Sequence, residues 1–84
     1  MLLTINFSKQ SEKKITSFSE YTKNYRNGTS EVIIVGRGLH GECFELYFAN
    51  EEDEKATFEA LKNAKNNSVV YVDCDCAFKC INRR

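Results

Sequence analysis

One histidine and four cysteines are the residues of this sequence best suited to metal or nucleophilic chemistry. His40 precedes Cys43 by three positions, and the other cysteines stand at positions 74, 76 and 80. Structural zinc sites usually present cysteine pairs on tight turns, and a catalytic cysteine needs a neighbouring base in an electropositive setting. Neither pattern is present, so we expect Cys43, Cys74, Cys76 and Cys80 to pack as small apolar side chains. A zinc-dependent or thiol enzyme is the third functional hypothesis.

A glycine-rich segment is the second candidate for chemistry. Residues 36–41 spell G-x-G-x-x-G directly after an apolar stretch, and this spelling resembles the dinucleotide-binding fingerprint of Rossmann folds. Phosphate binding at that motif requires a helix to begin at the glycines, so that its amide groups face the pyrophosphate. The residues that follow alternate like a strand, and we therefore predict a glycine-rich hairpin loop.

The strands that must position these residues follow from apolar periodicity. Residues 2–7 and 42–48 alternate apolar and polar side chains, and residues 31–35 are rich in β-branched side chains, so each predicts a strand. Residues 69–81 alternate throughout and predict one long, half-exposed strand. Its inward-facing residues would be Val70, Val72, Cys74, Cys76, Phe78 and Cys80.

Two other segments have helical features. Residues 15–28 place aromatic and aliphatic side chains at helical spacing, contain a Ser-x-x-Glu capping-box pattern and finish on Asn-Gly. The second helix would begin after an N-cap at Asn50, with acidic residues in its first turn and lysines near its end at Asn66-Asn67. Polar residues 8–14 would connect the first strand to the first helix.

The resulting order, β-α-β-β-α-β, predicts a single α+β domain, residues 1–84, with the split βαβ arrangement of the ferredoxin-like fold. Right-handed crossovers would place the four antiparallel strands in the order 4-1-3-2, with both helices on one face and the other face open. The 32–35 strand would then form a sheet edge. The first strand would separate the third from the fourth, too widely for Cys43 to form a disulfide with the later cysteines.

Charge is balanced across the chain but not along it. The 12 basic and 12 acidic residues cancel, yet residues 31–60 hold eight of the acidic ones. Tyrosines favour interfaces, and those of the predicted open face stand among carboxylates that a basic partner would meet. The predicted partner-binding residues are Glu45, Tyr47, Tyr71, Asp73, Asp75, Glu51, Glu52, Asp53 and Glu54.

These features predict a non-enzymatic protein-binding module without metal or cofactor. The expected partner is a basic protein, such as a nucleic-acid-binding host protein, and the exposed edge at 32–35 would permit a homodimer. Proline is absent and residues with A/T-rich codons are abundant, which suggests a phage or mobile-element inhibitor of a host factor. Without a signal peptide or an apolar run long enough to span a membrane, a cytoplasmic protein with reduced cysteines is expected.

An RNA-binding module of RRM-like topology is the alternative. That motif stacks bases on aromatic residues of its central strands, and Gly41, Phe44 and Tyr47 match its signature. Glu42 and Glu45 stand where aromatic and aliphatic residues should be, and carboxylates on the sheet would repel phosphate. The basic residues in favour of this alternative are those of the 9–14 segment and the final Arg83-Arg84.

Overall fold

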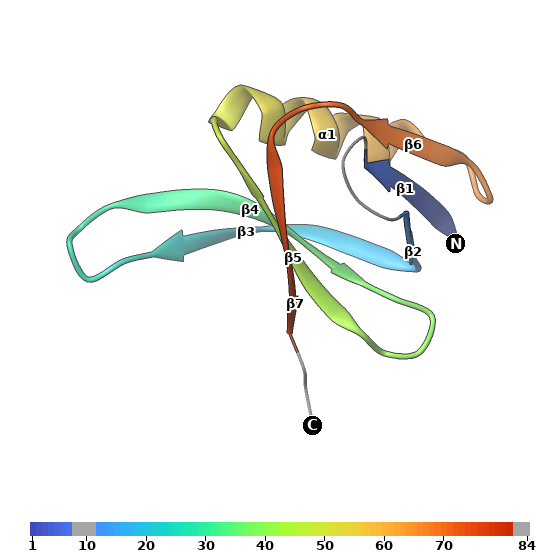
Figure 1. Ribbon diagram of the computed structural model, residues 1–84, viewed down its shortest axis with the longest axis horizontal. Helices are drawn as coiled ribbons and strands as arrows, with labels where there is room; N and C mark the ends of the chain where they lie inside the picture. The colour runs from blue at the N-terminus through green and yellow to red at the C-terminus, as the bar shows by residue number, and fades with distance from the viewer. Residues whose placement is uncertain (8–11, 82–84) are drawn as a thin grey trace.

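The computed structural model describes residues 1–7 and 12–81, which form two β-sheets and one helix (Figure 1). The elements are β1 (Leu3–Phe7), β2 (Lys13–Ile15), β3 (Ser17–Asn24), β4 (Ser30–Arg37), β5 (Cys43–Phe48), α1 (Glu51–Asn63), β6 (Val69–Val72) and β7 (Cys76–Ile81). One sheet has the order β2-β1-β6 and the other β3-β4-β5-β7. The protein is mostly β, so the prediction of a ferredoxin-like fold with two helices and one sheet was wrong.

The segment predicted as the first helix, residues 15–28, forms the last residue of β2, the whole of β3 and the turn after it. β3 pairs antiparallel with β4 along its whole length, from Ser17 opposite Arg37 to Asn24 opposite Ser30. Its serine, threonine and asparagine residues are poor helix formers, so pairing with an apolar strand decides the conformation. The Asn-Gly pair closes the hairpin, where Gly28 has a φ of 88°.

The helical spacing in this segment has another cause, which is a change of sheet at Thr16. Ile15 is buried from β2 in one sheet, and Phe18 packs on the same core from β3 in the other. The Thr16 amide donates to the Arg37 carbonyl at 2.8 Å, which holds the bend. Two residues three positions apart therefore reach the core without a helix between them.

The C-terminal alternating segment is two strands and not one. β6 runs parallel to β1, and β7 runs antiparallel to β5 from Cys43 opposite Ile81 to Phe48 opposite Cys76. The chain passes between the sheets at residues 73–75. Val70 and Val72 are buried as predicted, whereas Cys80 is exposed.

The predicted strand order was also wrong. β5 pairs directly with β7, so no strand lies between Cys43 and the last cysteines. β4 is flanked by β3 and β5, and the edges of this sheet are β3 and β7. From Ile34 to Arg37, β4 is paired on both sides, and the predicted dimer edge at 32–35 is therefore not an edge strand.

α1 covers the core that the two sheets share (Figure 1). Its predicted N-cap is confirmed, because the Asn50 side chain accepts a hydrogen bond from the Asp53 amide at 2.9 Å. The helix ends at Asn63, before the predicted end, and Asn66 instead accepts from the Leu2 amide at 2.7 Å. No helix among the described residues combines the length and the apolar character that a bilayer span requires.

The packing of α1 predicts a large cost for truncating Leu61. This side chain is fully buried in the core cluster, so Leu61→Ala should lower the free energy of unfolding by about 2–5 kcal/mol through lost burial and a residual cavity. Urea denaturation measures the change. The neighbouring exposed Lys62 provides a control, since Lys62→Ala should change stability by about 0.5 kcal/mol or less. Equal effects of the two substitutions would contradict this packing.

Candidate functional site

A surface hollow opens where β4 and β5 stop pairing. Their ladder extends only to Ile34 opposite Leu46, so the first half of β4 and the end of β5 diverge. The hollow has a volume of about 200 Å³ and is lined by Ser30, Glu31, Val32, Phe48, Ala49, Asn50 and Glu51. Its lining therefore comes from the starts of β4 and α1 and the end of β5.

A second hollow adjoins the first across the end of β5. It has a volume of about 410 Å³ and is lined by Tyr47, Phe48, Ala49, Asp75, Cys76 and Ala77. Phe48 and Ala49 belong to both hollows. We call the two together the acidic groove, because three carboxylates line it, those of Glu31, Glu51 and Asp75, and no lysine or arginine of the described residues does.

Further carboxylates surround the acidic groove. The charge of Asp53, in the first turn of α1, contributes to raising the pKa of the Cys74 thiol, after the larger effect of burial. The bend at residues 73–75 therefore lies close to the start of α1. The sequence places these two acidic segments about twenty residues apart, and the fold brings them to one corner.

The predicted partner-binding residues occupy several places. Tyr47, Glu51 and Asp75 line the acidic groove, and the nearby acids are Glu52, Asp53 and Asp73. Tyr71 lies on β6 and is 74% exposed. Tyr47 and Tyr71 do not share one open sheet face as predicted, because the alternating 69–81 segment is divided between two sheets.

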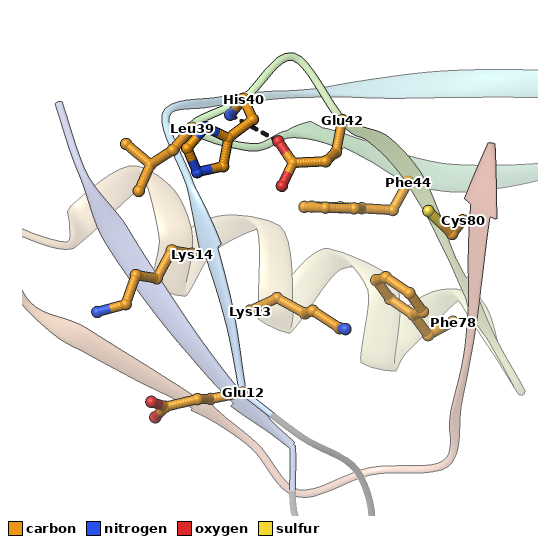
Figure 2. A pocket seen from close by; sticks show the side chains of 9 residues that line it. All are labelled: Glu12, Lys13, Lys14, Leu39, His40, Glu42, Phe44, Phe78 and Cys80. Carbon is orange, nitrogen blue, oxygen red and sulfur yellow. Dashed lines mark hydrogen bonds between the residues drawn. The ribbon is translucent and has the colours of Figure 1, made fainter. Parts of the chain in front are cut away.

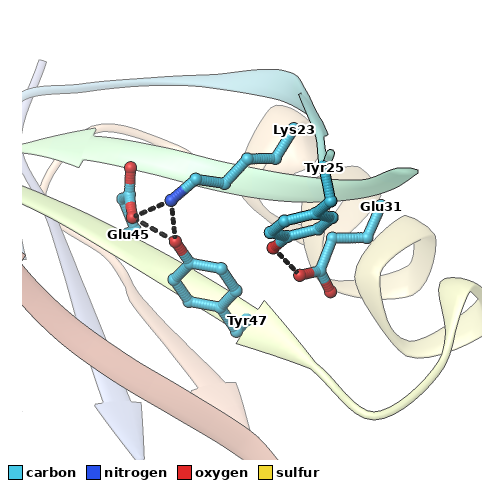
Figure 3. A network of polar contacts seen from close by, with 5 residues as sticks. All are labelled: Lys23, Tyr25, Glu31, Glu45 and Tyr47. Atoms are coloured by element: carbon cyan, nitrogen blue, oxygen red, sulfur yellow. Dashed lines mark hydrogen bonds and ion pairs between the residues drawn. The ribbon is translucent and has the colours of Figure 1, made fainter. Parts of the chain in front are cut away.

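Glu45 is held in a polar network on the face of the sheet away from α1 (Figure 3). The Lys23 ammonium reaches across β4 and donates to the Tyr47 hydroxyl at 2.5 Å and to Glu45 at 3.4 Å. The Tyr47 hydroxyl donates to Glu45, and this bond, followed by those from Lys23, keeps the pKa of Glu45 below its usual value. The Glu45 charge is thus balanced within the fold by the Lys23 ammonium.

Glu54 is the predicted surface acid that the fold buries. Its side chain is 0% exposed, and neither carboxyl oxygen has a hydrogen-bond partner among the described residues. Burial, and after it the nearby Glu20 carboxyl from β3, raises the pKa of Glu54 to about 7. The helical spacing of Glu54 with Phe58 and Leu61 was the signal in the sequence that could have revealed its burial.

Two of the cysteines, Cys74 and Cys76, lie in settings that favour the thiol. Cys43 faces away from Phe44, whereas Cys80 lies opposite Phe44, so these two cysteines lie on different faces of the sheet. All four are free. Burial, with a smaller effect of Cys74, raises the pKa of Cys76 to about 11. The part of the chain that the structure describes holds no group of three or more potential metal ligands.

The glycine-rich segment forms the predicted hairpin turn, beside a pocket of about 320 Å³ (Figure 2). The Glu42 carboxylate accepts from the His40 amide at 2.6 Å. Hydrogen bonds from the amides of Glu42 itself and of His40 lower the pKa of Glu42. The turn thus uses its own carboxylate where a phosphate site would need a free amide.

Aromatic rings form one side of this pocket (Figure 2). The rings of Phe44 and Phe78 lie 5.1 Å apart, and the Lys13 ammonium lies 4.8 Å from the centre of the Phe78 ring. Sequence reasoning missed this pocket, because Lys13 was placed in a connection and forms β2 instead. Of the basic residues noted for RNA binding, Lys9, Arg83 and Arg84 lie outside the described residues.

The chain matches no protein-family model, no curated protein and no solved structure. The predicted RRM-like topology was wrong for the same reason as the ferredoxin-like fold, because the RNA-recognition motif also requires a single sheet with two helices.

The burial of Glu54 predicts an unusual dependence of stability on pH. Its pKa is about 7 in the folded protein against an ordinary value of 4.5, so between these values the folded state holds a proton that the unfolded state has released. The free energy of unfolding should therefore fall as the pH rises from about 4.5 through about 7, by up to about 3 kcal/mol. Urea denaturation across this range measures the slope.

Substitution of Glu54 assigns the slope to this residue. Glu54→Leu should remove most of the decline and stabilise the protein above neutral pH, because an apolar side chain replaces a buried carboxylate. Glu52 is exposed in the same helical turn, and Glu52→Gln should keep the slope of the unmodified protein. If the free energy of unfolding of Glu54→Leu falls with pH as steeply as that of the unmodified protein, groups other than Glu54 cause the pH dependence.

Proposed function

We propose that this protein is a small, non-enzymatic binding module whose acidic groove recognises a basic segment of another protein. The observation that carries the proposal is the lining of the acidic groove: two adjoining hollows with apolar residues, three carboxylates and no lysine or arginine among the described residues. A field of one sign attracts an oppositely charged partner and aligns it as it approaches.

The shape of the acidic groove suits lysine and arginine side chains. Such side chains bury an apolar stem and keep the charged head at a polar boundary. Phe48 and Ala49, shared by both hollows, would contact the stems, while Glu31 and Glu51 on one side and Asp75 on the other would meet the heads. Tyr47 adds an aromatic ring, of the kind that interfaces favour.

The local charge at the acidic groove stays negative after its internal compensation is counted. Two positive charges compensate in part. The dipole of α1 places the equivalent of about +0.5 charge at its start, and the Lys55 ammonium lies 3.4 Å from a carboxylate oxygen of Glu51. Glu52 and Asp53 remain in the same turn, and Asp73 lies at the nearby bend. These carboxylates outnumber the compensating charges, which supports a preference for basic partners over neutral ones.

The settings of the cysteines support the non-enzymatic part of this proposal. A nucleophilic cysteine needs a lowered pKa, whereas burial raises the pKa of the Cys74 and Cys76 thiols. Basic segments of the kind required here are common on nucleic-acid-binding proteins, which we propose as the partner class.

A pair of labelled peptides tests this proposal. We expect a fluorescein-labelled peptide that alternates arginine and leucine to bind, with an affinity that falls as salt rises, and its glutamate–leucine counterpart not to bind. Fluorescence anisotropy measures both. Glu51→Lys should lower the affinity for the arginine peptide by about threefold to tenfold, because it reverses one charge of the acidic groove.

The control is Glu59→Lys, at an exposed position of the same helix. Like Glu51, Glu59 belongs to a surface ion pair, here with Lys62 at 3.2 Å, so both variants lose one such pair. Ala49→Arg should block the acidic groove, while Ala60→Arg on the exposed part of α1 should leave binding unchanged. Equal weakening by a groove variant and its control would place the binding surface elsewhere.

A further inference from the structure

β3 is a long strand with an open side. It has eight residues, and among the described residues its single neighbour in the sheet is β4. α1 contacts this strand through Phe58, whose ring centre lies 5.7 Å from that of Phe18. Six of the eight residues of β3 are exposed. Edge strands of this length offer their unpaired amide and carbonyl groups to another strand.

Alternation of the β3–β4 ladder identifies the outward groups. The Tyr25 amide donates to the Thr29 carbonyl at 2.9 Å, next to the pair Asn24 and Ser30. Antiparallel ladders alternate between hydrogen-bonded and non-hydrogen-bonded pairs, so the odd-numbered residues of β3 bond to β4. The amide and carbonyl groups of the even-numbered residues point outward, and these are Phe18, Glu20, Thr22 and Asn24.

The usual protection of an edge strand is weak in β3. Natural edges carry proline, bulges or charged side chains that discourage pairing, and this chain has no proline. The strand has two charged residues, Glu20 and Lys23, and Lys23 is held within its own subunit. Its ammonium donates to Tyr47 two strands away (Figure 3), so Glu20 is the one charge left exposed on the strand.

We propose that β3 pairs with β3 of a second copy of this chain, antiparallel and with a two-fold axis at Tyr21. This register overlaps residues 18–24 of both copies and lets every outward even-numbered residue form a hydrogen-bonded pair. Glu20 then lies opposite Thr22 of the second copy. The other register with equal overlap, residues 17–23, would set Glu20 opposite Glu20 of the second copy, and like charges opposite one another are destabilising.

Tyr21 is the residue that gains most from this pairing. Its side chain is 57% exposed, and at the two-fold axis it meets Tyr21 of the second copy in a non-hydrogen-bonded pair, where side chains are closest. Aromatic cross-strand pairs stabilise such positions. The two four-stranded sheets become one sheet of eight strands, and this pairing does not depend on the acidic groove.

The oligomeric state of the full chain tests the proposal. Sedimentation equilibrium should detect a dimer at concentrations up to about 100 µM. Tyr21→Lys places two like charges at the axis and should weaken the dimer about tenfold or more. Tyr71→Lys is the matched control, because Tyr71 is also exposed but lies on β6, and it should leave the dimer unchanged. A monomer throughout the range, or equal effects of both substitutions, would overturn the proposal.

Cross-linking tests the register independently of dimer strength. Residues of a non-hydrogen-bonded pair have Cα atoms about 4.5 Å apart, within reach of a disulfide. Tyr21→Cys should therefore form a covalent, reducible dimer under mild oxidation, detected by mass spectrometry, whereas Tyr71→Cys and the unmodified protein should not. Equal dimer formation by Tyr21→Cys and Tyr71→Cys, or none by Tyr21→Cys, would exclude the two-fold axis at Tyr21.

Discussion

Two bends, at Thr16 and at residues 73–75, are the constraint on which the rest of this structure depends. At each bend the chain leaves the β2-β1-β6 sheet and enters the β3-β4-β5-β7 sheet. The sheets therefore share one core, with α1 over it. A small chain gains by this arrangement, because buried apolar area is what stabilises it and one shared core buries more than two separate ones.

The divergence of β4 and β5 links this architecture to the proposed function. The two strands are paired as far as Ile34 and Leu46 and separate beyond them, which leaves room for the acidic groove between the ends of the sheet and the start of α1. The second bend supplies Asp75 to the same place. The nearness of Asp75 to the other carboxylates is thus a consequence of where the chain changes sheets. On the neighbouring sheet face the Lys23 ammonium balances the charge of Glu45.

Part of the fold could be predicted because local patterns decide it. Periodicity and the Asn50 cap correctly placed β1, β4, β5 and the start of α1. The glycine-rich segment could be predicted as a hairpin turn because the residues after it alternate like a strand. Part of the candidate site followed as well, since Tyr47, Glu51 and Asp75 line the acidic groove. The burial of Glu54 was not predicted, because an acidic side chain is expected on the surface even where its helical position faces the core.

The amino-acid sequence by itself determined which side chains of each segment are apolar and therefore which face turns inward. Only the tertiary structure decided that residues 17–24 are a strand, that 69–81 is divided and that β5 lies beside β7. The physical reason is that periodicity is a local property, while strand pairing joins residues far apart in the chain. An alternating segment keeps its pattern whether it stays in one sheet or bends into another, so its partners are chosen by the packing of the whole core.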